Sequence, residues 1–172
     1  MNRARRGGHR GQIVRSLGTL AALTILGWST AEGGSPAAVI PYIVYDGYFV
    51  SNKFEPDVAT SFVVLQDQRA FDRVFGVASF MFDRARRLQA NPFRSRIVAA
   101  TIHRGHEDVR YRIIGVVRDG TVLQVRYTTT VRPTPLTEFA CPLILSVPRD
   151  NYSTVAFIEN GTLVKTVRIF AR

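Results

Sequence analysis

The stretch Val109-Arg-Tyr-Arg-Ile-Ile-Gly-Val-Val-Arg-Asp-Gly-Thr-Val-Leu-Gln-Val-Arg-Tyr-Thr-Thr-Thr130 decides the fold of this chain, because it has the pattern of a β-hairpin. Residues that favour strands, β-branched and aromatic ones, dominate both of its halves. Asp119-Gly120 lies between the halves and favours a two-residue turn of type I′. The stretch therefore predicts two long antiparallel strands.

This turn also predicts which side chains lie opposite one another. Counting back from it places Ile114 opposite Val125 and Arg112 opposite Tyr127. Successive side chains of a strand point to opposite faces, so the register predicts one apolar face and one wetter face. The apolar face is expected to carry Ile114, Val116, Leu123, Val125 and Tyr127, and the wetter face Gln124 and Arg126.

Further strands are predicted on both sides of this hairpin. A second hairpin is expected over residues 153–170, with Asn160-Gly161 as its turn. Residues 142–148 form an apolar run framed by prolines, which favours an edge position because proline has no N–H to donate. The remaining strand candidates are residues 39–50, 61–65 and 97–103.

One short helix is expected near residues 68–75. Asp67 precedes it and is a suitable N-cap, and Gly76 is expected to end it. Its apolar face at helical spacing consists of Phe71, Val74 and Phe75.

Together these elements predict a mainly β fold, an antiparallel sandwich or open barrel of about seven or eight strands with this one helix. The expected organisation is a signal segment at 1–31, a leader and N-terminal strand region at 32–60, and a β domain at 61–172. Cys141 is the only cysteine of the chain, so stability must come from packing and not from an intrachain disulfide.

Residues 1–31 have the three-part layout of a secretory signal. Five arginines and no acidic residue precede an apolar run from Leu17 to Trp28, and Ser29-Thr-Ala31 then supplies small residues suited to a signal peptidase. The apolar run is shorter than the roughly 20 residues that a membrane-spanning helix needs. We expect export to the periplasm or the extracellular space with cleavage after Ala31; the alternative is an uncleaved N-terminal anchor.

The charge of the chain changes when this segment is set aside. The full sequence has 23 Lys and Arg against 13 Asp and Glu, a net charge of +10. Without the five arginines of the signal, the net charge falls to about +5. That value suits contact with an anionic surface, whereas export argues against a nucleic-acid partner.

Three stretches of the sequence are similar to one known family. Residues 62–75 resemble its opening strand and short helix, residues 92–100 its next strand, and residues 139–149 its late strand bracketed by prolines. The family is the C-terminal domain family named after PrcB. Where that family has a Thr-Gly-Gly-Tyr turn, this chain has Arg104-Gly-His-Glu-Asp-Val-Arg-Tyr111, with a single glycine. The resemblance implies a non-catalytic, exported interaction domain, like the accessory component of a secreted bacterial protease complex.

The densest polar cluster is His103-Arg-Gly-His-Glu-Asp108, between two predicted strands. His103, His106 and Glu107 or Asp108 supply the side chains of a candidate metal site. Their spacing differs from the His-Glu-x-x-His pattern of zinc protease helices. With Cys141, the two histidines also supply the groups of a hydrolase. The interpretation we favour is a solvated charged turn, with Cys141 as a small apolar residue of a strand.

A second candidate site is a sheet face of arginines and tyrosines. Its residues are Arg110, Arg112, Arg126 and Tyr127, which lie on the two strands of the first hairpin. Such a face suits an acidic polymer, a lipid head group or a partner protein. Solvated arginines scattered over strands are the simpler alternative.

The sequence thus predicts a non-catalytic exported domain that interacts with another envelope or secreted protein, supporting an enzyme there. No catalytic residue and no cofactor are expected. Two alternatives stay open: a metal-dependent or cysteine hydrolase centred on His103, His106 and Cys141, and a binder of anionic polymers or membrane surfaces through the Arg/Tyr face.

Overall fold

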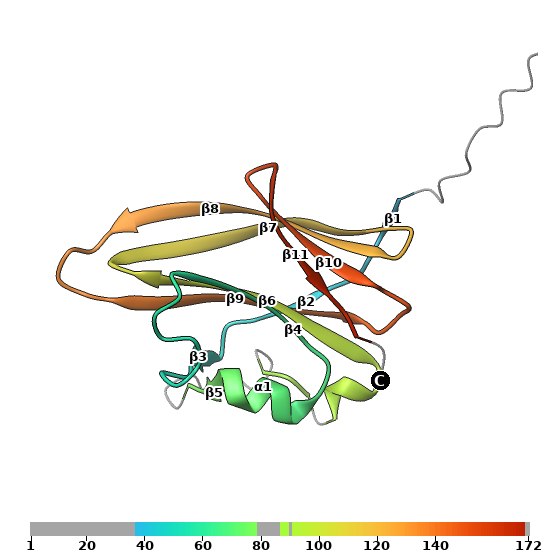
Figure 1. Ribbon diagram of the computed structural model, residues 1–172, viewed down its shortest axis with the longest axis horizontal. Coiled ribbons are helices and arrows are strands. Elements are labelled where there is room, and N and C mark those ends of the chain that lie inside the picture. The colour runs from blue at the N-terminus through green and yellow to red at the C-terminus, as the bar shows by residue number, and fades with distance from the viewer. Residues whose placement is uncertain (1–36, 79–86, 90, 171–172) are drawn as a thin grey trace, which may run out of the picture. The chain divides into compact units, whose positions relative to one another are not determined.

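The computed structural model describes residues 37–78, 87–89 and 91–170, which all belong to one compact unit (Figure 1). These residues form eleven strands and one α-helix, so the predicted mainly β fold is confirmed. Seven of the strands are six residues or longer and the other four have two or three. Two sheets pack face to face, and the described strands do not close into a barrel. The expected signal segment lies outside the described residues.

The central hairpin consists of β7 (Glu107–Asp119) and β8 (Val122–Pro133). Its loop is Gly120-Thr121, one residue later than predicted, because Asp119 still pairs with Val122. Of the two loop residues only Gly120 has a positive φ, 57°, which fits a type II′ turn and not the predicted type I′.

The register of this hairpin therefore differs from the predicted pairs. Near the turn, Val116 lies opposite Val125. A bulge between Ile113 and Gly115 then shifts the register by one residue, so that Ile113, not Arg112, lies opposite Tyr127.

The predicted faces are nevertheless right with one exception. When the turn moves by one residue, the residue that lies opposite each position changes by two. Because side chains alternate between the faces of a strand, a change of two keeps every side chain on its predicted face. The bulge turns Ile114 outward, and it is 56% exposed where the sequence predicted a core residue. The other predicted core residues, Val116, Leu123, Val125 and Tyr127, are all buried.

Sheet A contains five strands in the order β1-β7-β8-β10-β11. Its further members are β1 (Ala38–Val39), β10 (Thr154–Glu159) and β11 (Thr162–Arg168). The turn between β10 and β11 is Asn160-Gly161, as predicted, with φ values of 49° and 84° that fit type I′. β10 runs parallel to β8, and the other pairs among the described strands are antiparallel.

Sheet B contains four strands in the order β2-β9-β6-β4. They are β2 (Ile43–Tyr45), β9 (Phe139–Pro148), β6 (Arg96–Gly105) and β4 (Thr60–Leu65). The predicted edge position of residues 142–148 is wrong, because β2 covers β9 on its other side. Both prolines are compatible with this position, since β2 pairs only with the three residues from Ile144 to Ser146 between them. Strands β1 and β2 come from the expected leader and N-terminal strand region at 32–60, and they pair with sheet A and sheet B respectively.

A third layer covers the other face of sheet B, as Figure 1 shows below β6 and β9. It contains α1 (Gln68–Val74), the short pair β3 (Tyr48–Val50) and β5 (Phe75–Val77), and a 3-10 turn at Pro92–Arg94. Asp67 caps α1 as predicted, its Oδ1 accepting a hydrogen bond from the Ala70 N–H at 2.7 Å. Gly76 does not end the helix as predicted. It lies in β5, where the Phe49 ring packs against the position that a side chain would occupy.

Two clusters of buried side chains hold the three layers together. The first lies between sheets A and B and includes Val116, Leu123, Tyr127, Leu145 and Phe157. The second lies between sheet B and the α1 layer and includes Val98, Ile102, Ile144 and the predicted helix residues Phe71, Val74 and Phe75. Sheet B is thus the middle layer, with both faces buried.

Candidate functional site

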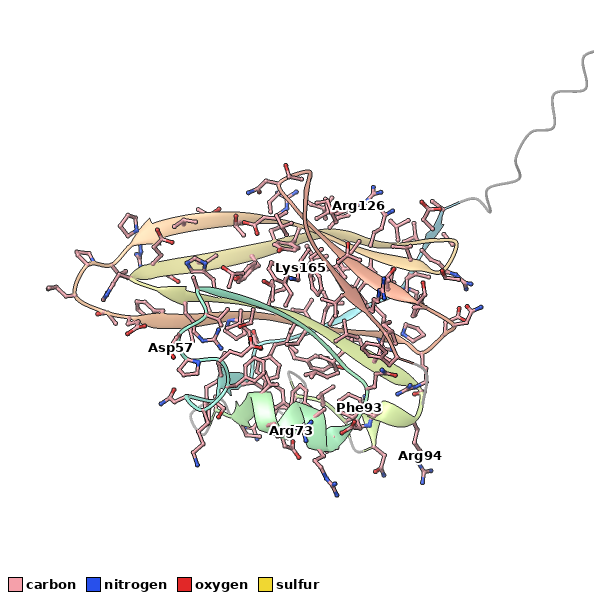
Figure 2. All side chains as sticks on the ribbon, in the orientation of Figure 1. Asp57, Arg73, Phe93, Arg94, Arg126 and Lys165 are labelled. Atoms are coloured by element: carbon pink, nitrogen blue, oxygen red, sulfur yellow. The ribbon has the colours of Figure 1, made fainter. Side chains whose placement is uncertain are left out.

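The predicted Arg/Tyr face is divided between the two faces of sheet A. Arg110, Arg112 and Arg126 are exposed on the face turned away from sheet B, and Figure 2 shows Arg126 there. Tyr127 is only 1% exposed and lies in the core between the sheets. The prediction that Tyr127 belongs to a binding face with these arginines is therefore wrong. Arg126 precedes Tyr127 directly in β8, so their side chains point to opposite faces. The bulge in β7 puts Arg110 and Arg112 on the outer face as well, because it places Thr128 opposite Arg112.

The polar cluster between β6 and β7 gathers some of the predicted site residues and not others. His103 and Glu107 are hydrogen-bonded, with Nε2 and Oε2 3.0 Å apart, and both are partly exposed. His106 is exposed at the turn between the two strands. In the part of the chain that the structure describes, no group of three or more His, Cys, Asp or Glu side chains is arranged to hold a metal ion.

Cys141 lies directly opposite His103, on the neighbouring strands β9 and β6. Its sulfur accepts a hydrogen bond from the Val109 N–H at 3.4 Å and donates one to the Glu107 carbonyl at 3.8 Å. The His103 ring is bound to the Glu107 carboxylate. The thiol is thus engaged by the backbone of β7, as expected of a structural cysteine.

Two tyrosines place hydroxyl groups in the core between the sheets, at the end next to Cys141. The Tyr111 hydroxyl donates to the Cys141 carbonyl at 3.1 Å, and the Tyr127 hydroxyl donates to Glu159 at 3.2 Å. Burial raises the pKa of both tyrosines well above its usual value, so both hydroxyls stay protonated. They act here as hydrogen-bond donors that satisfy buried acceptors of the sandwich.

A groove of about 710 Å³ runs along β4, on the side of that strand away from β6. Its floor is β4 itself, from Phe62 to Leu65. One wall is α1, through Ala70 and Val74, and the other consists of Val167 in β11 and Phe170 just after the end of that strand. Apolar surface thus lines the floor and both walls.

Local contacts hold the two ends of this groove in place. At one end, the Arg104 guanidinium donates to the Phe54 carbonyl at 2.9 Å and to Ser61 Oγ at 2.8 Å. At the other end, the Gln66 amide donates to the Phe170 carbonyl at 3.1 Å. The Asp67 cap fixes the start of α1 beside this second end. These hydrogen bonds therefore anchor the walls of the groove to elements of both sheets.

The charged side chains of the groove are mostly basic. Lys53, Arg73 and Arg168 line it and are all exposed; Figure 2 shows Arg73 on α1. Asp72 is the acidic residue among the lining side chains, and its carboxylate accepts a hydrogen bond from the Gln68 amide at 2.7 Å. Positive charge therefore surrounds an apolar floor.

The sequence pattern does not predict this groove. It predicts a strand at 61–65 and a helix at 68–75, but it does not place the two beside each other at the edge of a sheet. The usable signal was local: the strand from Thr60 to Leu65 has no charged residue. Its position at an edge depends on pairings between distant strands, which a local pattern does not specify.

Comparisons with known protein families, curated proteins and solved structures find no match to this chain. Among the described residues, no helix is long and apolar enough to cross a membrane.

Proposed function

We propose that this protein is a non-catalytic, exported interaction domain that binds another protein of the envelope or of the secreted space and supports its work. The observation that carries this proposal is the groove along β4, which has an apolar floor and apolar walls beside an edge of β4 that pairs with no other strand among the described residues. Apolar grooves and free strand edges are both used to bind segments of partner proteins.

The contacts of the polar residues support a non-catalytic role. The histidine that faces Cys141 is bound to Glu107, and the Cys141 sulfur contacts backbone groups of β7. In a Cys–His pair, the histidine activates the cysteine by hydrogen bonding to its sulfur. The N-terminal signal pattern supports export, and the resemblance to the PrcB family supports an accessory role beside an enzyme.

Photo-crosslinking in the native host tests this proposal. Benzoylphenylalanine in place of Phe170, an exposed aromatic residue of the groove, is expected to give a light-dependent adduct with one partner protein. The matched control carries the same residue in place of Ile114, which is exposed on the far face of sheet A. Equal adducts from both positions, or none from the groove, would contradict the proposal.

Cell fractionation and N-terminal sequencing test the exported location separately. The mature protein is expected outside the cytoplasm with Glu32 as its first residue. A protein that keeps Met1 and stays with the membrane would support the alternative of an uncleaved anchor.

A further inference from the structure

We propose that the groove binds an extended, apolar segment of a different protein, flanked by acidic residues, which adds to sheet B as a new strand beside β4. This inference rests on the proposed function and specifies the chemistry of the partner.

The edge of β4 is suited to receive a strand. Within the described residues, β6 is the only strand paired with β4, so alternate backbone N–H and C=O groups of β4 point into the groove. The neighbouring edge strand of sheet A, β11, carries Lys165 and Arg168, and charged side chains of this kind protect an edge against pairing. β4 has no such protection.

The two walls define the side-chain pattern of the bound segment. Alternate residues of an added strand point to opposite faces of sheet B. One set lies beside Phe62 and Val64, toward the wall formed by Val167 of sheet A and by Phe170 just after it. The other set lies beside Val63 and Leu65, toward α1. Both walls are apolar, so the segment is expected to be apolar on both faces, over about six residues to match the length of β4.

The charges favour acidic flanks and disfavour a second copy of this chain. Lys53, Arg73 and Arg168 surround the floor and outnumber the single lining carboxylate, that of Asp72. Two copies that paired through β4 would bring these three cations of each copy toward those of the other. A segment with Glu or Asp at its ends instead places opposite charges beside them.

Peptide selection on the purified full-length protein tests the inference. The probe is a display library of random peptides about twelve residues long, enough for one strand and both flanks. We expect the selected peptides to combine an apolar, β-branched core with acidic ends. The double variant Arg73→Glu, Arg168→Glu should bind them about tenfold more weakly, because two attractive contacts become repulsive.

Matched controls separate strand addition from general charge attraction. The variant Arg112→Glu, Arg126→Glu has the same change in net charge on the far face of sheet A, and it should change the affinity less than about twofold. In an extended peptide, alternate backbone amides point to opposite edges, and only one edge would pair with β4. N-methylation of the amides on that edge should therefore weaken binding about tenfold, whereas N-methylation of the other set should not.

Each other outcome overturns the inference. Selected peptides without acidic residues, an unchanged affinity of the groove variant, or equal losses in both double variants would exclude the acidic segment. Insensitivity to N-methylation would exclude strand addition, and a dimer that selected peptides dissociate would make a second copy the occupant. If selection fails while the Phe170 position still crosslinks to a partner, the proposed function stands and the strand inference falls.

Discussion

Neighbouring residues along a strand are both buried in sheet B, whereas in sheet A one is buried and the next is exposed. In β9 of sheet B, Ile144 and Leu145 point to opposite faces, and both are almost completely buried. In β8 of sheet A, Val125 is buried while its neighbour Arg126 is exposed. Sheet B is therefore a middle layer that needs apolar residues on both faces, whereas sheet A needs them on one. This difference shows which surfaces the fold leaves for binding.

The largest expected effects come from truncating both faces of β9. Ile144→Ala and Leu145→Ala should each lower the free energy of unfolding by about 2–5 kcal/mol, because each leaves a cavity in a different core cluster. In sheet A, Leu123→Ala should have a similar cost, but Gln124→Ala should stay within about 0.5 kcal/mol. Urea denaturation of the four variants measures these costs.

A nearly neutral Ile144→Ala would contradict the claim that sheet B is buried on both faces. That result would mean that the α1 layer does not cover sheet B tightly in solution. A large cost for Gln124→Ala would instead mean that the outer face of sheet A is covered as well.

The second largest effect is expected at alkaline pH, in the core that the two sheets share. Burial, with Glu159 close by, raises the pKa of Tyr127 above its usual value of 10 in the folded protein. Above about pH 10 the unfolded chain loses the tyrosine proton while the folded protein keeps it, so stability falls as the pH rises. Below this pH the contribution is constant.

The size of this alkaline effect has an upper limit of about 1.4 kcal/mol per pH unit for one tyrosine. Tyr127→Phe should make the loss of stability between about pH 9 and 11 less steep, at the cost of about 1 kcal/mol at neutral pH for the hydrogen bond to Glu159. Tyr42→Phe, which removes a hydroxyl from an exposed tyrosine, is the matched control substitution. Equal slopes in wild type and Tyr127→Phe would contradict the prediction.

A smaller effect is expected where α1 begins, in the layer that covers the second face of sheet B. Asp67→Ala removes the acceptor of the Ala70 N–H and should lower stability by about 1 kcal/mol. Asp57→Ala removes the same charge from an exposed position and should stay within about 0.5 kcal/mol. Thermal unfolding of both variants distinguishes the cap from the charge. A neutral Asp67→Ala would mean that packing of Phe71 and Val74 alone holds the layer.

The two hairpins show how far local sequence predicts this fold. At Asn160-Gly161 the prediction is right, because both residues adopt positive φ and asparagine does so more readily than most residues. At Asp119-Gly120 the loop lies one residue later, and Gly120 takes its first position. One glycine fits either loop, so local preference did not decide between them. The bulge beside Ile114 likewise has no signal in the alternating pattern.

The candidate site was less predictable than the fold because it depends on long-range pairing. The helix cap and two residues of the predicted apolar face were correct from spacing alone, since Asp67, Phe71 and Val74 are close in sequence, whereas Phe75 belongs to β5 and not to the helix. The groove needs β4 to be an edge and β11 to end beside it, and these strands are about 100 residues apart. The Arg/Tyr face failed for two reasons: the bulge moved Arg110 and Arg112 to the face opposite Tyr127, and alternation along β8 puts Arg126 on that same outer face.

The smallest expected effect tests the open face of sheet A at Ile114, an apolar residue that the bulge turns outward. If that face is solvated, Ile114→Thr keeps the β-branched shape and loses little burial, so stability should change by less than about 0.5 kcal/mol. The neighbouring Val116→Thr places a hydroxyl in the core and should cost far more. Urea midpoints of the two variants should therefore differ clearly. Equal midpoints would mean that Ile114 is covered in solution, which would make the outer face of sheet A, and not only the groove, a contact surface.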